Sequence, residues 1–180
     1  MQDARNDPQL GFRHGLLAAV LLGAVWRLGV LVVDKWHQQL LLNDSFYYSA
    51  QAQQIAHGRW FREIFVDQPG AEHGPLTSLL LASVSWLDDP VPWQRLCTVL
   101  FGIATIAVIG LLGRRVGGPR VGVIAALVAA AYPNLWMNDG LVMSESLNML
   151  LVSLVLLAGH HALTTPGWRI AAIIGALTGL

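Results

Sequence analysis

Apolar residues along this chain are grouped into long blocks that alternate with short polar segments. Each of the first two blocks contains one charged residue, Arg27 in residues 15–33 and Arg95 in residues 93–112. Further blocks follow at residues 120–136, 145–163 and 168–180. Because a membrane-spanning helix needs about 20 apolar residues, the pattern predicts four spanning helices and the start of a fifth. We therefore expect an all-α polytopic membrane protein and interpret the chain as the N-terminal part of a larger one.

Composition supports lipid as the solvent of these blocks. Hydrophobic residues make up 54% of the chain and charged residues 12%, whereas soluble domains carry about 25% charged residues. The single cysteine, Cys97, lies inside an apolar block, so no disulfide framework is expected. The formal net charge is zero, and nothing in the sequence points to a nucleic-acid partner.

The arginines predict which segments face the cytoplasm. They occur before the first block, three times in the turn RRVGGPR at residues 114–120, and after the fourth block. The positive-inside rule then assigns these places to the cytoplasm. Two outer loops result, at residues 34–92 and 133–144. The apolar stretch Pro75–Leu87 lies in the first loop and is too short to span, so we expect it to form a helix in the outer interface.

The first outer loop contains the candidate site residue Asp44. It precedes a segment with helical spacing that ends at Gly58. Asp is a favoured helix N-cap, and a carboxylate held in this way is also suited to act as a general base. Tyr47 and Tyr48 are either anchors at the membrane interface or walls of a site. His73 is a loop histidine, a proton carrier or a ligand.

The second outer loop contributes two more candidate carboxylates. Asp139 precedes a glycine in a predicted turn, and Glu145 is expected in the first turn of the fourth spanning helix, where the helix dipole favours an acid. We expect Glu145 to be the more important, because a residue that opens a helix is held more firmly than a turn residue. Arg27 either snorkels outward or pairs with an acidic or phosphate group, and Arg95 has the same alternatives.

Taken in order, these features resemble the polyprenyl-phosphate-sugar-dependent glycosyltransferases of the GT-C fold, in particular the protein mannosyltransferase and aminoarabinose transferase group. The similarity extends over about residues 15–160. Its elements are Asp44, Tyr47–Tyr48, Ala56–Gly58, His73–Leu76, Arg95–Leu96, Gly113–Arg115, Pro133, Asp139 and Glu145. The chain departs from the family at Asn43, where an acid is common, and at Gly74, where the first of two prolines is expected.

The resemblance implies a GT-C-like N-terminal transmembrane module that transfers a sugar from a polyprenyl-phosphate donor, with inversion. The acceptor would be a hydroxyl group on a protein, lipid or glycan at the outer face of the cell membrane. Asp44 would be the base, Glu145 or Asp139 the second acid, and Tyr47, Tyr48, His73 and Arg95 substrate-binding residues. A divalent metal held by Asp44 and Glu145 is left open.

Two other classes of protein remain compatible with the sequence. A polytopic transporter or lipid flippase would use the acids and Arg27 for ions or lipid headgroups. A transporter is expected to place its charges near the bilayer midplane, whereas the carboxylates here gather in the outer loops. A non-catalytic membrane scaffold is the third class.

Overall fold

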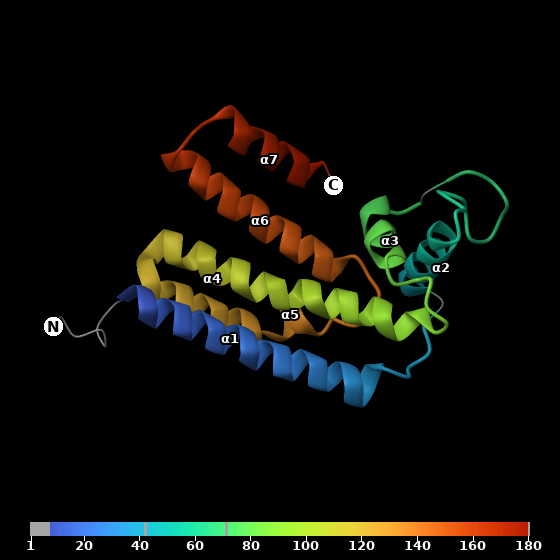
Figure 1. Ribbon diagram of the computed structural model, residues 1–180, viewed down its shortest axis with the longest axis horizontal. Coiled ribbons are helices and arrows are strands. Elements are labelled where there is room, and N and C mark those ends of the chain that lie inside the picture. The colour runs from blue at the N-terminus through green and yellow to red at the C-terminus, as the bar shows by residue number, and fades with distance from the viewer. Residues whose placement is uncertain (1–7, 42, 71, 180) are drawn as a thin grey trace.

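The computed structural model describes residues 8–41, 43–70 and 72–179, and no strand occurs among them. Its elements, in chain order, are α1 (Pro8–Val30), the π-helical turn η2 (Leu31–Lys35), α2 (Asp44–Ala56), α3 (Pro75–Ala82), α4 (Pro90–Ala131), α5 (Pro133–Trp136), α6 (Glu145–Thr164) and α7 (Trp168–Thr178). Figure 1 shows a bundle of long helices with the short α2 and α3 gathered at one end.

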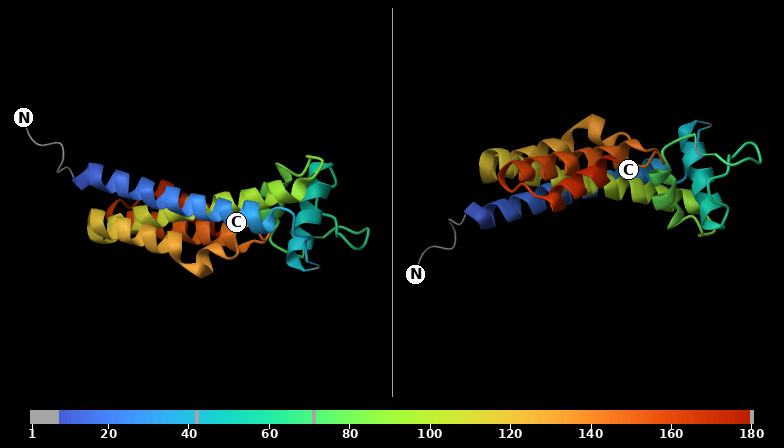
Figure 2. Two further views of the ribbon diagram at one scale, coloured as in Figure 1. Left: turned by 90° about the horizontal axis from the view of Figure 1, so that it is seen from below. Right: turned by 90° about the horizontal axis from the view of Figure 1, so that it is seen from above.

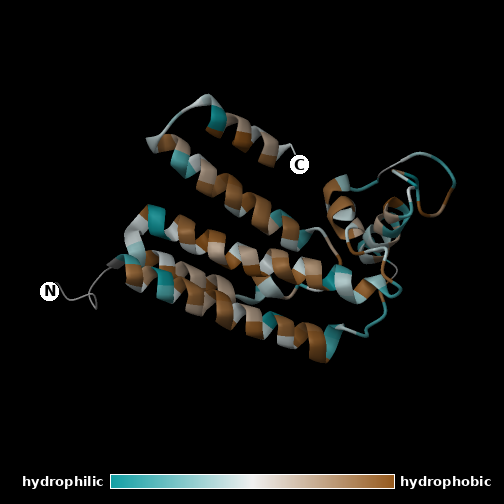
Figure 3. Ribbon diagram, viewed as in Figure 1, coloured by the Kyte–Doolittle hydropathy of each residue, from teal (hydrophilic) through white to brown (hydrophobic). Residues whose placement is uncertain are grey.

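Three helices are long and apolar enough to cross a membrane: Gln9–Lys35, Pro90–Ala131 and Glu145–Thr164. Hydrophobic residues run along these helices and along α7, while polar residues concentrate near the two ends of the bundle (Figure 3). The expectation of an all-α chain with spanning helices is therefore confirmed at this level.

Helix α4 is broken in the middle and folds back on itself. Gly118 has φ 86° and ψ −177°, and Pro119 follows it. Positive φ is a conformation that glycine adopts without steric cost. Past this break the two arms pack so closely that a Cβ at Gly122 would overlap the carbonyl oxygen of Gly110. The predicted blocks 93–112 and 120–136 correspond to the two arms, except that the second arm ends at Ala131.

The packed arms bury one of two apolar cores. Ile106 of the first arm contacts Ala126, Ala129 and Ala130 of the second arm and Ala19 of α1. Small residues at such contacts let helix backbones approach closely, as in the helix pairs of membrane proteins. This core holds α1 and both arms of α4 together, and Figure 2 shows these helices side by side from two further directions.

The second core fixes α2 and α3 to the end of the bundle. Tyr48 and Ala52 of α2 pack there with Leu81 of α3 and with Val142 from the segment before α6. Helix α3 ends at Ala82, so it is shorter than the predicted Pro75–Leu87 helix. The remaining residues form turns. We call this end of the bundle the α2–α3 end.

The opposite end carries the start of α1, the turn of α4 and the α6–α7 turn (Figure 1). Here the Arg114 guanidinium lies 4.6 Å from the centre of the Phe12 ring, and Arg115 Nη1 lies 3.0 Å from His161 Nδ1. The arginines of the RRVGGPR turn thus lie at the end of the bundle away from α2 and α3.

Candidate functional site

Asn43, and not Asp44, caps α2. The Asn43 side chain accepts a hydrogen bond from the backbone N–H of Ser45 at 3.0 Å, and its backbone is extended, with φ −146° and ψ −159°. Asn caps a helix about as well as Asp does, so the chain enters the helix one residue earlier than predicted. The prediction that Asp44 is the cap is therefore wrong. Asp44 is the first helical residue, and its side chain is 58% exposed.

His73 lies directly beside this carboxylate. Its Nε2 is 3.4 Å from Asp44 Oδ1. The imidazole also contacts two aromatic rings of α2, at centroid distances of 4.5 Å to Tyr47 and 5.2 Å to Tyr48. The structure thus brings together four residues that the sequence analysis identified as candidates. His73 is 25 or more positions along the chain from the other three. We call Asp44, Tyr47, Tyr48 and His73 the Asp44 cluster.

The Tyr47 hydroxyl connects α2 to the segment that carries His73. It accepts a hydrogen bond from Gln51 Nε2 at 3.0 Å and another from the backbone N–H of Glu72 at 2.8 Å. Tyr47 is buried, and burial raises the pKa of its hydroxyl, which therefore stays protonated. Because Glu72 immediately precedes His73, this hydroxyl holds the imidazole against Asp44.

Asp139 lies in a different place and has a different environment. It is buried, its Oδ2 accepts a hydrogen bond from Arg27 Nε at 2.7 Å, and its Oδ1 accepts one from the Ser146 hydroxyl at 2.6 Å. Burial raises the pKa of this carboxyl, while Ser146, Arg27 and Lys35 act in the opposite direction. The carboxylate joins α1 to α6 and is held on both oxygens.

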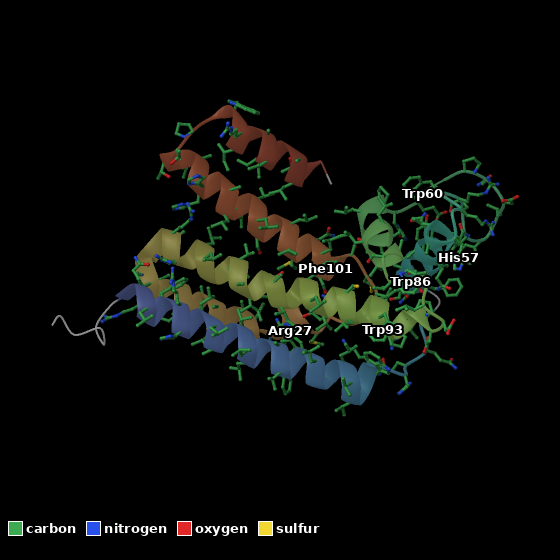
Figure 4. All side chains as sticks on the ribbon, viewed as in Figure 1. Arg27, His57, Trp60, Trp86, Trp93 and Phe101 are labelled. Atoms are coloured by element: carbon green, nitrogen blue, oxygen red, sulfur yellow. The ribbon has the colours of Figure 1, made fainter. Side chains whose placement is uncertain are left out.

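Arg27 also completes the end of α4. Its Nη1 donates to the carbonyl of Ala130 at 3.0 Å, and its Nη2 donates to that of Ala129 at 3.2 Å. The last carbonyls of a helix lack partners within it, and Arg27 satisfies two of them. Of the alternatives left open for Arg27, the structure selects pairing with an acid. Figure 4 shows Arg27 between α1 and α4.

Sequence reasoning missed two residues that support this ion pair. Lys35 Nζ donates to the backbone carbonyls of Met137 and Asp139, at 2.8 and 2.6 Å. Gly102 lies under the Asp139 side chain, where a Cβ would overlap the carboxylate. A lysine at the very end of an apolar block was the available signal for Lys35. For Gly102, one glycine among many, the sequence contains no comparable signal.

Glu145 and Arg95 each have shielded polar atoms without a hydrogen-bond partner among the described residues. Glu145 opens α6 as predicted, but within the described residues its Oε2 has no hydrogen bond. Arg95 is 3% exposed, and its Nε and Nη1 likewise have no partner there. The expectation that Glu145 is held more firmly than Asp139 is wrong, because Asp139 has the ionic partner.

The structure does not join the second-loop acids to the Asp44 cluster. No hydrogen bond or ion pair between described residues links Asp44 to Asp139 or Glu145. In the same described ranges, no three His, Cys, Asp or Glu side chains gather closely enough to hold a metal ion.

Two hollows lie along α6, one beside Tyr48 of the Asp44 cluster and one beside α7. A cavity of about 110 Å³ lies between α2, α3 and α6, lined by Tyr48, Thr77, Asn148 and Leu151 among others. A groove of about 480 Å³ between α6 and α7 is also lined by Asn148 and Leu151. The two hollows thus meet on α6, with Tyr48 at one end and apolar helix surface at the other.

Comparisons with protein-family models, with curated proteins and with solved structures found no match to this chain.

Proposed function

We propose that this chain belongs to a membrane-embedded glycosyltransferase, which moves a sugar from a polyprenyl-phosphate donor to an acceptor hydroxyl at the outer face of the cell membrane. The observation that carries the proposal is the Asp44 cluster. An accessible carboxylate lies beside an imidazole and two aromatic rings. The cluster lies at the end of a bundle whose helices are suited to lipid. A lipid-linked donor and a water-side acceptor can meet there.

Asp44 is the base in the proposed reaction. A hydroxyl group attacks poorly at neutral pH unless a positioned base removes its proton. Asp44 takes this proton while the acceptor oxygen bonds to the anomeric carbon, the bond from that carbon to the phosphate oxygen breaks, and polyprenyl phosphate leaves. His73 lies 3.4 Å from one carboxylate oxygen and orients the group. The second oxygen has no hydrogen-bond partner among the described side chains and is proposed to bind the acceptor.

The path along α6 supports a lipid-linked donor. The α6–α7 groove has the mostly apolar lining that a polyprenyl chain needs, and it shares Asn148 and Leu151 with the smaller cavity beside Tyr48. In the proposed reaction the chain lies in the groove and the donor sugar lies toward the Asp44 cluster.

Arg95 is the proposed partner of the donor phosphate. The neighbouring residue Gln94 donates to the Ser49 carbonyl of α2 at 3.5 Å and to the Ser85 hydroxyl at 2.8 Å, so this part of α4 contacts the helix that carries Asp44. A guanidinium donates in a fork that suits phosphate oxygens. The two unpartnered nitrogens of Arg95 are consistent with such a ligand.

The transporter alternative has less support in the bundle. Arg27, Lys35 and Asp139 are buried charges, but they bind one another and backbone carbonyls. A transported ion or headgroup would have to displace these contacts.

The test is the variant Asp44→Asn of the full-length protein, with Asp67→Asn as the matched control. Asp67 is a more exposed carboxylate in the same outer loop, paired with Arg62. Membranes containing each variant are assayed for transfer from a panel of polyprenyl-phosphate sugars. We expect Asp44→Asn to lower transfer by about 100-fold or more, and Asp67→Asn to leave it unchanged. Normal transfer by Asp44→Asn would exclude Asp44 as the base.

A further inference from the structure

A larger cleft lies on the other side of α2 from the Asp44 cluster. It has a volume of about 680 Å³ and is bounded by α2, by the segment that follows η2 and by the start of α4. Phe46, Ser49 and Gln53 line it, at the spacing of one helix face. Tyr47, Tyr48 and the rest of the Asp44 cluster occupy the opposite face. The volume is within the range of about 300–1,000 Å³ typical of small-molecule sites.

The polar lining of this cleft is rich in amides. Four glutamines contribute to it: Gln38, Gln39, Gln53 and Gln54. Each primary amide offers two donors and an acceptor, which matches hydroxyl groups, because these both donate and accept. The Oε1 atom of Gln54 is shielded and has no hydrogen-bond partner among the described residues. Its acceptor capacity is therefore unused in the chain alone.

The apolar lining includes two aromatic rings, Trp36 and Phe46, and each packs against an aromatic ring that lies outside the lining. Phe46 stacks on Phe65, with ring centroids 6.2 Å apart and an angle of 18° between the planes. Trp36 meets Trp93 edge to face at 5.8 Å. The faces of such rings are electron-rich, and they pack well against the C–H groups of a pyranose. Amides beside aromatic faces are a suitable lining for a sugar.

The charge of the lining argues against a phosphorylated ligand. None of the described residues that line the cleft is a lysine or arginine; His37 contributes one imidazole, and Asp89 contributes a carboxylate. Phosphate groups are usually bound by Arg and Lys, and a carboxylate repels them. A carboxylate does accept hydrogen bonds from hydroxyl groups. The cleft therefore favours a neutral polyhydroxylated ligand over a phospholipid headgroup.

We propose that this cleft binds a short neutral saccharide. Phe46 lines the cleft and lies two residues from Asp44 in α2, so the cleft and the proposed base lie on opposite faces of the same helix. The role of the saccharide as the acceptor, or as the sugar portion of the acceptor, rests on the proposed function. The binding itself does not depend on that function.

The experiment measures saccharide binding directly, without donor. The full-length protein is placed in lipid nanodiscs, because maltoside detergents would themselves occupy a sugar site. Saturation-transfer NMR then tests maltose, cellobiose and mannobiose, with glycerophosphoglycerol as a headgroup probe. We expect a signal from at least one disaccharide and none from glycerophosphoglycerol. A signal from glycerophosphoglycerol alone, or from no probe, would overturn the proposal.

Variants then locate the binding. Gln39→Leu combined with Gln54→Leu removes two amides of the cleft, and we expect the disaccharide Kd to rise at least tenfold. Gln68→Leu is the matched control, because this glutamine is exposed on the loop after α2 and is not among the residues lining the cleft. Phe46→Leu is a second test variant, which keeps an apolar side chain and removes the ring. Unchanged binding in both cleft variants would contradict the proposed location.

Failure of this proposal is distinguishable from failure of the proposed function. Disaccharide binding that the cleft variants abolish, in a protein that transfers no sugar from any donor, would support the cleft and refute the glycosyltransferase. Sugar transfer that depends on Asp44, in a protein that binds no disaccharide, would support the glycosyltransferase and refute saccharide binding in the cleft.

Discussion

Arg27 and Asp139 are 112 residues apart in the chain, and their side chains form a buried ion pair with a 2.7 Å distance between Nε and Oδ2. The pair joins α1 to the segment that leads into α6, and Ser146 binds the second carboxylate oxygen. Removing one member of a buried pair leaves an uncompensated charge, which costs about 3–5 kcal/mol. These residues therefore hold α1, α4 and α6 in position.

We expect Arg27→Met to lower the stability of the bundle by about 3–5 kcal/mol. The double variant Arg27→Met, Asp139→Leu should recover part of this loss, because neither charge remains and an apolar pair often replaces a buried ion pair without loss. Thermal unfolding in detergent measures both. If the double variant loses as much unfolding free energy as the two single variants lose together, or more, the result would contradict direct pairing.

Gly102→Ala should destabilise the same connection from the α4 side. A methyl group there would overlap the Asp139 carboxylate, and such overpacking costs about 1–3 kcal/mol. Alanine is otherwise the better helix former by about 1 kcal/mol, so a loss of stability is informative. Gly29→Ala in α1 is the control, since a Cβ there meets nothing within 4 Å. Equal unfolding temperatures for the two variants would show that Asp139 does not need this space.

Tyr47→Phe should loosen the segment that carries His73. The variant removes the acceptor of the Glu72 N–H, a hydrogen bond worth about 1 kcal/mol, so amide exchange at Glu72 should become about fivefold faster. Tyr48→Phe is the control, because no hydrogen bond of its hydroxyl occurs among the described residues. Hydrogen-exchange mass spectrometry compares the peptides. Unchanged exchange in Tyr47→Phe would remove the hydroxyl from the positioning of His73.

Cysteine labelling tests the predicted orientation in the membrane. Gln68→Cys and Val116→Cys place thiols at opposite ends of the bundle, both on exposed positions. Val116 is chosen within the RRVGGPR turn rather than Gly118, because the φ of 86° at Gly118 disfavours any residue with a side chain. With Cys97 replaced by alanine, an impermeant maleimide added to intact cells should label only Gln68→Cys. Labelling at residue 116 from outside would reverse the topology and move the Asp44 cluster to the cytoplasm.

Several local features of the fold were predictable because neighbouring residues determine them. Gly58 follows the end of α2 with φ 80°, Glu145 opens α6, and the chain reverses at Gly118–Pro119. Gly58 depends on the backbone freedom of glycine, Glu145 on the helix dipole, and the reversal on glycine followed by the proline ring. All three properties act within a few positions of the chain. The prediction failed by one residue at Asn43, because two good capping residues stand side by side and the sequence does not rank them.

The sequence by itself determined that this chain forms apolar helices and that Asp44 stands at the start of one. Only the tertiary structure decided which polar groups meet. Asp139 is paired with Arg27 and Glu145 is not paired within the described residues, although the sequence favoured Glu145. His73 lies beside Asp44 because the segment after α2 turns back, with Glu72 bound to Tyr47. Side-chain pairing over such separations depends on how helices pack, and hydrophobic periodicity carries no information about it.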